Sequence, residues 1–307
     1  MAGPIIQCGQ LARWYGSVSA LTAVDLNIPA GITGLLGPNG AGKSTLLRII
    51  TGQIEPSSGT CTVFGKNPMT DESVFRDIGF CSEDDALFEH MTAREVVTFL
   101  ARLSGFPRAE AAERAAASLE TAGMTPNADR QTTAFSKGMR QRTRIAAALV
   151  HSPTLILLDE PMTGLDPVGR RDVLELVRRL AAAGTSVVFS SHILHEVGAV
   201  AGHIVVLHHG MVLAEGSLAE IRADLADHPF TICIRCDDAR SLALRLGALE
   251  FVTTLKIRGR DSLEVGSDSA LKLLSALPPL VVEAGYELTE ISAPGETVEA
   301  VFQRLLK

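Results

Sequence analysis

Long apolar runs are absent from this 307-residue sequence. None approaches the roughly 18 residues that a helix needs to span a bilayer. The first residues, Met1 to Pro4, also lack the basic segment followed by an apolar one that marks a secretory signal. We therefore expect the protein to remain in the cytoplasm and to reach a membrane only through another protein.

Basic charge is equally scarce. The sequence has 28 lysines and arginines against 35 aspartates and glutamates, which gives a net charge of −7. Domains that bind nucleic acid usually carry a basic surface instead, so we expect no nucleic-acid partner. The hydrophobic content of 46% allows one large core or two smaller ones, and the length favours two domains.

Cysteines are few and scattered. Among the five, only Cys233 and Cys236 have the C-x-x-C spacing that invites a zinc or redox interpretation. They lie in a predicted strand, 231–236, where an odd spacing directs the two side chains to opposite faces. No second pair of ligands accompanies them, so we interpret them as ordinary thiols.

One stretch, residues 37–45, matches the phosphate-binding pattern G-x-x-x-x-G-K-[ST]. It consists of Gly37, Pro38, Asn39, Gly40, Ala41, Gly42, Lys43, Ser44 and Thr45. A predicted strand, 32–36, precedes it and a predicted helix, 46–50, follows it, so a chance glycine-rich turn is the poorer explanation. Glycines let backbone N–H groups surround a polyphosphate. Lys43 would then neutralise phosphate oxygens, and the Ser44 hydroxyl would ligate Mg²⁺.

Polar residues also follow two other apolar strands. Asp159 and Glu160 end the run 155–158. Asp159 could ligate Mg²⁺, while Glu160, directed the other way along the pleat, could position the attacking water. His192 follows the strand 186–190 and could bond the γ-phosphate, because the carboxyl ends of parallel strands meet at one edge. Taken alone, the acidic pair could be a solvated turn and the histidine a structural one.

Alternating strands and helices predict an α/β fold with a parallel sheet covered on both faces. A helical insert at about residues 86–152 separates two strand-rich regions, and one of its helices begins at a capping box, Thr92 to Glu95. The character changes near residue 228, so we place the domains at 1–228 and 229–307. The second domain follows the order β-α-β-β-α-β of a ferredoxin-like fold, with a further helix at 297–306. We expect it to be regulatory or to support dimerisation.

The ordered motifs resemble the nucleotide-binding subunit of an ATP-binding-cassette (ABC) transporter. Residues 37–45 resemble Walker A, 155–160 Walker B, 135–139 the signature, 164–166 the D-loop and His192 the switch histidine. The resemblance spans nearly the whole first domain. It implies a P-loop NTPase fold of the ABC type, with a helical subdomain, that binds and hydrolyses ATP with Mg²⁺.

The resemblance also implies a head-to-tail dimer, of two identical or two different chains, that closes on two ATP molecules. Ser136 and Gly138 of one copy would contact the ATP held by the other, and Asp166, in the D-loop, is assigned to the same nucleotide site. Hydrolysis through Glu160 would release the pair. Tyr15 falls at the position of the base-stacking aromatic, although such rings more often fill a core.

Two positions depart from the family pattern. The signature usually reads Leu-Ser-Gly-Gly-Gln, whereas residues 135–139 read Phe-Ser-Lys-Gly-Met; Ser136 and Gly138 remain. Together with residues 140–142 this resembles subunits that serve ABC-2-type exporters. Glu83 stands where the Q-loop glutamine belongs, and it could ligate Mg²⁺ or be merely an exposed acid.

One cassette without a membrane span implies a separate permease. We therefore expect the protein at the cytoplasmic face of the membrane, serving export. The predicted docking site is the groove between Glu83 and the helical insert, where Leu87, Phe88 and Met91 are either contacts or core residues. The rival is a soluble ABC ATPase that acts on a macromolecular assembly, but the sequence shows no paired cassette, long coiled coil or zinc-site cysteines. A kinase or GTPase would not explain Ser136 and His192.

Overall fold

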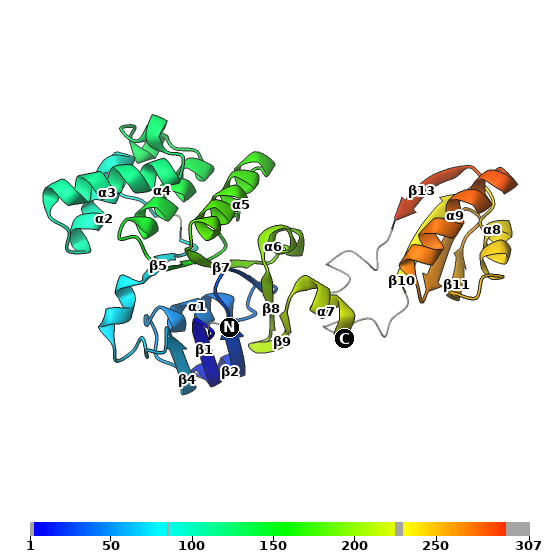
Figure 1. Ribbon diagram of the computed structural model, residues 1–307, viewed down its shortest axis with the longest axis horizontal. Coiled ribbons are helices and arrows are strands. Elements are labelled where there is room, and N and C mark those ends of the chain that lie inside the picture. Colours follow the sequence, from blue (N-terminus) through cyan, green and yellow to red (C-terminus); the bar gives the residue numbers. More distant parts are fainter. Residues whose placement is uncertain (1–2, 85, 225–229, 293–307) are drawn as a thin grey trace. The chain divides into compact units, whose positions relative to one another are not determined.

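The computed structural model describes residues 3–84, 86–224 and 230–292, and the chain divides into two compact units, Met1–Leu218 and Ala219–Lys307 (Figure 1). The domain boundary predicted at residues 228 and 229 lies outside the described residues, as does the helix predicted at 297–306. Among the described helices, none is long and apolar enough to cross a bilayer.

A six-stranded sheet carries the first unit. In spatial order its strands are β5 (Ile78–Cys81), β6 (Leu155–Leu158), β7 (Ser186–Ser191), β3 (Ile32–Leu36), β8 (His203–His208) and β9 (Met211–Gly216). The first five are parallel and β9 pairs antiparallel to β8. β6 and β7 are buried along their whole length, which explains their unbroken apolar runs. The predicted parallel sheet is confirmed.

A smaller antiparallel sheet lies in the same unit, in the order β2 (Val18–Ile28), β1 (Ile6–Tyr15) and β4 (Ser58–Val63). α1 (Lys43–Ile50) contributes its apolar face to a core that also takes side chains from both sheets. Four of its residues are fully buried: Leu46, Leu47, Ile49 and Ile50. Each such side chain stabilises the fold by about 1.5–3 kcal/mol. This packing fixes the start of α1 beside β3, at the end of the phosphate-binding stretch.

The helical insert contains α2 (Ala93–Leu103), α3 (Arg108–Thr121) and α4 (Lys137–Leu149), which Figure 1 shows grouped apart from β1, β2 and β4. The predicted capping box is present: Thr92 Oγ1 accepts from the Glu95 N–H at 3.2 Å, and Glu95 Oε2 accepts from the Thr92 N–H at 2.7 Å. Short 3₁₀ segments lie at Glu72–Arg76, Thr125–Asn127 and Thr132–Ala134.

The next three helices along the chain are α5 (Pro167–Ala182), α6 (Leu194–Val200) and α7 (Leu218–Asp224). We predict from the sequence that α5 begins at Arg170, and this is three residues too late. Asp166 accepts from the Gly169 N–H at 2.8 Å, and Pro167 occupies the first helical position, where its missing N–H costs nothing.

The second unit has the predicted element order: β10 (Phe230–Cys236), α8 (Ala239–Leu246), β11 (Val252–Arg258), β12 (Ser262–Ser267), α9 (Ala270–Ala284) and β13 (Leu288–Ser292). Its antiparallel sheet has the order β11-β12-β10-β13, and it has a core of its own around Ile234 and Val265. Cys236 belongs to that core, whereas Cys233 is only half-buried and lies on the other face. Within the described ranges no cluster of three or more His, Cys, Asp or Glu could hold a metal ion.

Candidate nucleotide-binding site

The loop between β3 and α1 has a backbone that only glycine allows. Gly40 and Gly42 adopt φ angles of 80° and 104°. A Cβ on Gly42 would lie 2.5 Å from the Ala20 carbonyl oxygen, and one on Gly37 would lie 2.3 Å from that of Leu207. The loop is therefore packed closely against its surroundings, and it leads into the N-terminus of α1, an end of a helix that favours anions.

Lys43 is the cation of this loop. It is only 5% exposed, and its ammonium donates to the carbonyl oxygens of Gly37 at 2.7 Å and Pro38 at 3.2 Å. The same Nζ lies 3.1 Å from Glu160 Oε1. The charge is thus held inside the loop, where phosphate oxygens would have to bind.

Asp159 and Glu160 lie on the loop that follows β6 and have different partners. Asp159 is buried and accepts a 2.7 Å hydrogen bond from the Ser190 hydroxyl, which itself accepts from the Glu160 N–H at 2.7 Å. The strand ends at Leu158, so the pleat does not separate the two carboxylates as predicted. A left-handed turn at Glu160, φ 45°, does so instead. Ser190 fixes both residues from the neighbouring strand.

Glu160 lies at the centre of the site. Its Oε2 is 3.0 Å from His192 Nδ1 and accepts from the Thr163 hydroxyl at 3.0 Å. Burial alone would raise the pKa of this carboxyl, but the Lys43 ammonium and the bonds from His192 and Thr163 outweigh burial and lower the pKa below its ordinary value. Glu160 is therefore a carboxylate at neutral pH.

The other carboxylate oxygen of Glu160, Oε1, can accept a further hydrogen bond. Oε1 is buried and, among the described residues, accepts no hydrogen bond. Lys43 Nζ, 3.1 Å away, is its ion-pair partner. A buried carboxylate oxygen that can accept a further hydrogen bond is suited to bind a small polar molecule such as water.

The structure brings Lys43, Asp159, Glu160 and His192 together at the carboxyl ends of β6 and β7. His195, on α6, is exposed. Tyr15 is 45% exposed at the end of β1, with the Arg13 guanidinium 4.8 Å from its ring centroid. It therefore does not fill a core, and the guanidinium covers one face of the ring.

The remaining predicted residues lie on separate elements. Ser136 accepts from the Met139 N–H at 3.3 Å and caps α4, and a Cβ on Gly138 would meet nothing within 4 Å. Asp166 caps α5. Glu83 is exposed, two residues beyond β5. In the single chain, the described partners of Ser136 and Asp166 are backbone groups of the helices that they cap.

The fold and the site define a nucleoside triphosphatase of the P-loop class. The family model "ABC transporter" matches residues 21–163. The chain is 38% identical to the daunorubicin/doxorubicin resistance ATP-binding protein DrrA of Streptomyces peucetius over 259 residues, 84% of this chain and 78% of that protein. It is 31% identical to the bacitracin transport ATP-binding protein BcrA of Bacillus licheniformis over 313 residues, covering 98% of this chain and 97% of that protein.

Solved structures similar to this chain are also ATP-binding cassettes. An ATP-binding subunit of an ABC transporter superposes with a TM-score of 0.64 at 30% identity, covering 72% of this chain and 93% of that one. The ATP-binding cassette MJ0796, described as a dimeric post-hydrolysis state bound to ADP and phosphate, gives 0.63 at 28% identity, covering 69% and 98%. The chain belongs to the ABC transporter family, and it is an ATP-binding and ATP-hydrolysing subunit of the transport type.

Proposed function

We propose that the chain works as a pair of cassettes that close head to tail on two ATP molecules and drive an ABC-2-type exporter. The pair would be attached to the cytoplasmic face of the membrane through a separate permease. The observation that carries this proposal is the Lys43–Glu160–His192 constellation beside the glycine loop. It joins a phosphate-binding cation, a charged base and a histidine at one sheet edge.

In this proposal the triphosphate occupies the loop of residues 37–45 and displaces the carbonyl oxygens from Lys43. Glu160 Oε1 accepts the proton of the attacking water as that water adds to the γ-phosphorus, and ADP leaves with the bridging oxygen. His192 bonds the γ-phosphate while its other ring nitrogen remains near Glu160. Tyr15 stacks on the base.

The residues present also fit Mg²⁺, which when bound to phosphate oxygens neutralises their charge. Ser44 offers a hydroxyl and Asp159 a carboxylate, the oxygen ligands that this ion takes. Glu83, exposed beyond β5, is a further candidate. Magnesium sites of this class rely on one or two side chains plus substrate phosphates, so they need no preformed cluster of carboxylates.

The second copy would complete each site. Ser136 begins α4 with its hydroxyl at the N-terminus, and Gly138 presents no side chain that would block an approaching phosphate. Asp166 would lie at the same interface.

Replacing Glu160 with Gln removes the base but keeps the size of the side chain, so hydrolysis should be lost while ATP binding remains. Normal turnover of Glu160→Gln would remove Glu160 from this role.

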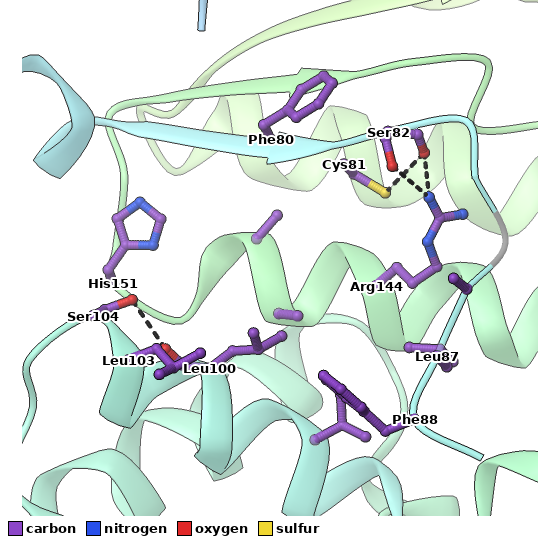
Figure 2. A pocket seen from close by; sticks show the side chains of 14 residues that line it. Phe80, Cys81, Ser82, Leu87, Phe88, Leu100, Leu103, Ser104, Arg144 and His151 are labelled. Atoms are coloured by element: carbon purple, nitrogen blue, oxygen red, sulfur yellow. Dashed lines mark hydrogen bonds between the residues drawn. The ribbon is translucent and has the colours of Figure 1, made fainter. Parts of the chain in front are cut away.

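The permease would dock in a groove beside the helical insert. A cavity of about 590 Å³ lies between β5 and helices α2 and α4, and Figure 2 shows Leu87, Phe88 and Leu100 around it, with Arg144 directed toward Ser82. Of the residues named for this groove, Leu87 and Phe88 line the cavity, whereas Glu83 and Met91 are not among the lining residues. The apolar walls suit a short helix of a membrane partner.

Docking of the permease in this groove can be tested with a matched pair of variants. Leu103 lines the cavity and is 68% exposed, whereas Met69 is an exposed apolar residue outside it. Leu103→Glu should abolish co-purification with the permease and leave ATP binding unchanged, and Met69→Glu should alter neither. Unchanged co-purification of the Leu103→Glu variant would disprove this placement.

The cargo would be selected by the permease. Two relatives are named for resistance to daunorubicin and doxorubicin and for bacitracin transport, which supports a drug-like compound as cargo. Stimulation of the ATPase activity of the co-purified complex by such compounds, and not by unrelated solutes, is the test.

A further inference from the structure

Glu196, on α6, is a buried carboxylate that the proposed reaction does not use. It is 6% exposed. A charge is costly to bury unless it is paired and hydrogen-bonded, so the partners of Glu196 show what the residue holds together.

One carboxylate oxygen binds the segment that carries His192. The Ser191 hydroxyl donates to Glu196 Oε2 at 2.7 Å. The same hydroxyl accepts from the Ile193 N–H at 3.0 Å. Ser191 and Ile193 are the two neighbours of His192 in the chain, so this pair of bonds holds the backbone on both sides of the histidine.

The other oxygen binds the start of α5. Arg170 Nη1 donates to Glu196 Oε1 at 3.1 Å, and Arg170 Nε donates to the Leu165 carbonyl at 3.1 Å. Leu165 directly precedes Asp166, the N-cap of α5. A continuous set of bonds therefore runs from the His192 segment through Glu196 and Arg170 to the Asp166 turn.

We propose that Glu196 is a positioning residue that holds the His192 segment and the Asp166 turn in one fixed geometry. This inference rests on the proposed function, in which His192 meets the γ-phosphate and Asp166 faces the second cassette. Because both carboxylate oxygens are engaged by donors from different elements, neither segment shifts without breaking a charge-assisted bond. The γ-phosphate contact is thereby linked to the surface that the partner cassette touches.

Three variants separate positioning from simple packing. Glu196→Gln keeps the size of the side chain and an oxygen for Ser191, but loses the ionic bond to Arg170. Arg170→Met breaks the same link from a side chain that is 37% exposed, and thus without altering the buried carboxylate. Glu175→Gln is the control, since it breaks an exposed pair with Arg178 on the same helix.

The first measurement is steady-state ATP hydrolysis together with ATP binding. Misplacing reacting groups by about 1 Å costs up to about a hundredfold in rate. We therefore expect Glu196→Gln and Arg170→Met each to lower kcat about tenfold or more. The affinity for ATP should be unchanged in both variants. The double variant should lose no more than Arg170→Met alone, because both substitutions break the link between Glu196 and Arg170. The Glu175→Gln control should match the unchanged protein.

The second measurement does not depend on hydrolysis. Amide hydrogen exchange should accelerate in both segments, 164–170 and 191–195, in each of the two variants, and in neither segment in the control. Acceleration confined to the mutated segment, additive losses in kcat, or a kcat within about twofold of normal would overturn the inference. If the unchanged protein failed to hydrolyse ATP, the proposed function would fall, while coupled exchange would still report on Glu196.

Discussion

Lys43 and Glu160 depend on one another, because each is the main charged neighbour of the other inside a nearly closed site. The positive charge keeps the carboxyl ionised, and the carboxylate holds the ammonium in the loop. A change at either residue should therefore alter the acid stability of the chain, and a change at Lys43 should also weaken nucleotide binding.

The acid stability of the chain tests the charge state of Glu160. Its pKa is lowered in the folded protein from an ordinary value of 4.5, so ionised Glu160 stabilises the fold above pH 4.5, and this contribution is lost as the pH falls through the lower folded pKa. The unfolding free energy of the unchanged protein relative to Glu160→Gln should thus be constant near neutrality and decline below about pH 5. Denaturant unfolding at several pH values measures it, and a difference that grows on acidification would contradict the sign.

Removal of the ammonium tests the other half of the pair. Lys43→Ala should weaken ATP binding by about ten- to a hundredfold, since a hydrogen bond to a charged group contributes about 1.5–3 kcal/mol. The pKa of Glu160 should rise in this variant. Lys66→Ala is the control, because Lys66 bonds Ser73 instead. An unchanged dissociation constant for Lys43→Ala in a binding titration would exclude Lys43 from phosphate binding.

At the scale of elements, the proposed function gives Ser136 a role in pairing besides its cap of α4, and mutation separates the two. Ser136 caps α4 and Thr92 caps α2 in the same helical insert, each through one side-chain hydrogen bond. Ser136→Ala and Thr92→Ala should both cost about 1 kcal/mol of stability. Only Ser136→Ala should also weaken ATP-driven pairing, measured by sedimentation in the Glu160→Gln background. Equal effects of both variants on pairing would reduce Ser136 to a cap.

The elements were largely predictable because their signals are local. The glycine loop, the apolar runs of β6 and β7, and the capping box at Thr92 each depend on neighbours in the sequence. The bridge from Ser190 to Asp159 could not be predicted, since the two residues are 31 positions apart and meet only through strand pairing. Glu196 was not predicted as a site residue for the same reason. Thr163 and Ser190 were not predicted either, although each is a polar residue close in sequence to a predicted site residue.

At the scale of the whole molecule, two separate cores predict two unfolding transitions. The core around Leu46 and the core around Ile234 are each made of residues from one unit. ATP should shift only the transition of the first unit, by about 2.7 kcal/mol at a hundredfold excess over the dissociation constant. Calorimetry with and without nucleotide measures this, and the chain lacking residues 230–307 should retain only the shifted transition. A single transition that ATP shifts as a whole would contradict independent units.

In the proposed function one chain is insufficient. Lys43, Glu160 and His192 meet within a single copy, whereas Ser136, Gly138 and Asp166 lie at the ends of other helices. The proposed function requires a second copy to bring these two groups together around ATP.

The most direct test is sedimentation of purified Glu160→Gln with ATP, with ADP and without nucleotide. We predict a dimer with ATP and a monomer in the other two conditions, because the γ-phosphate joins the two copies. A variant that binds ATP and remains monomeric would contradict the account.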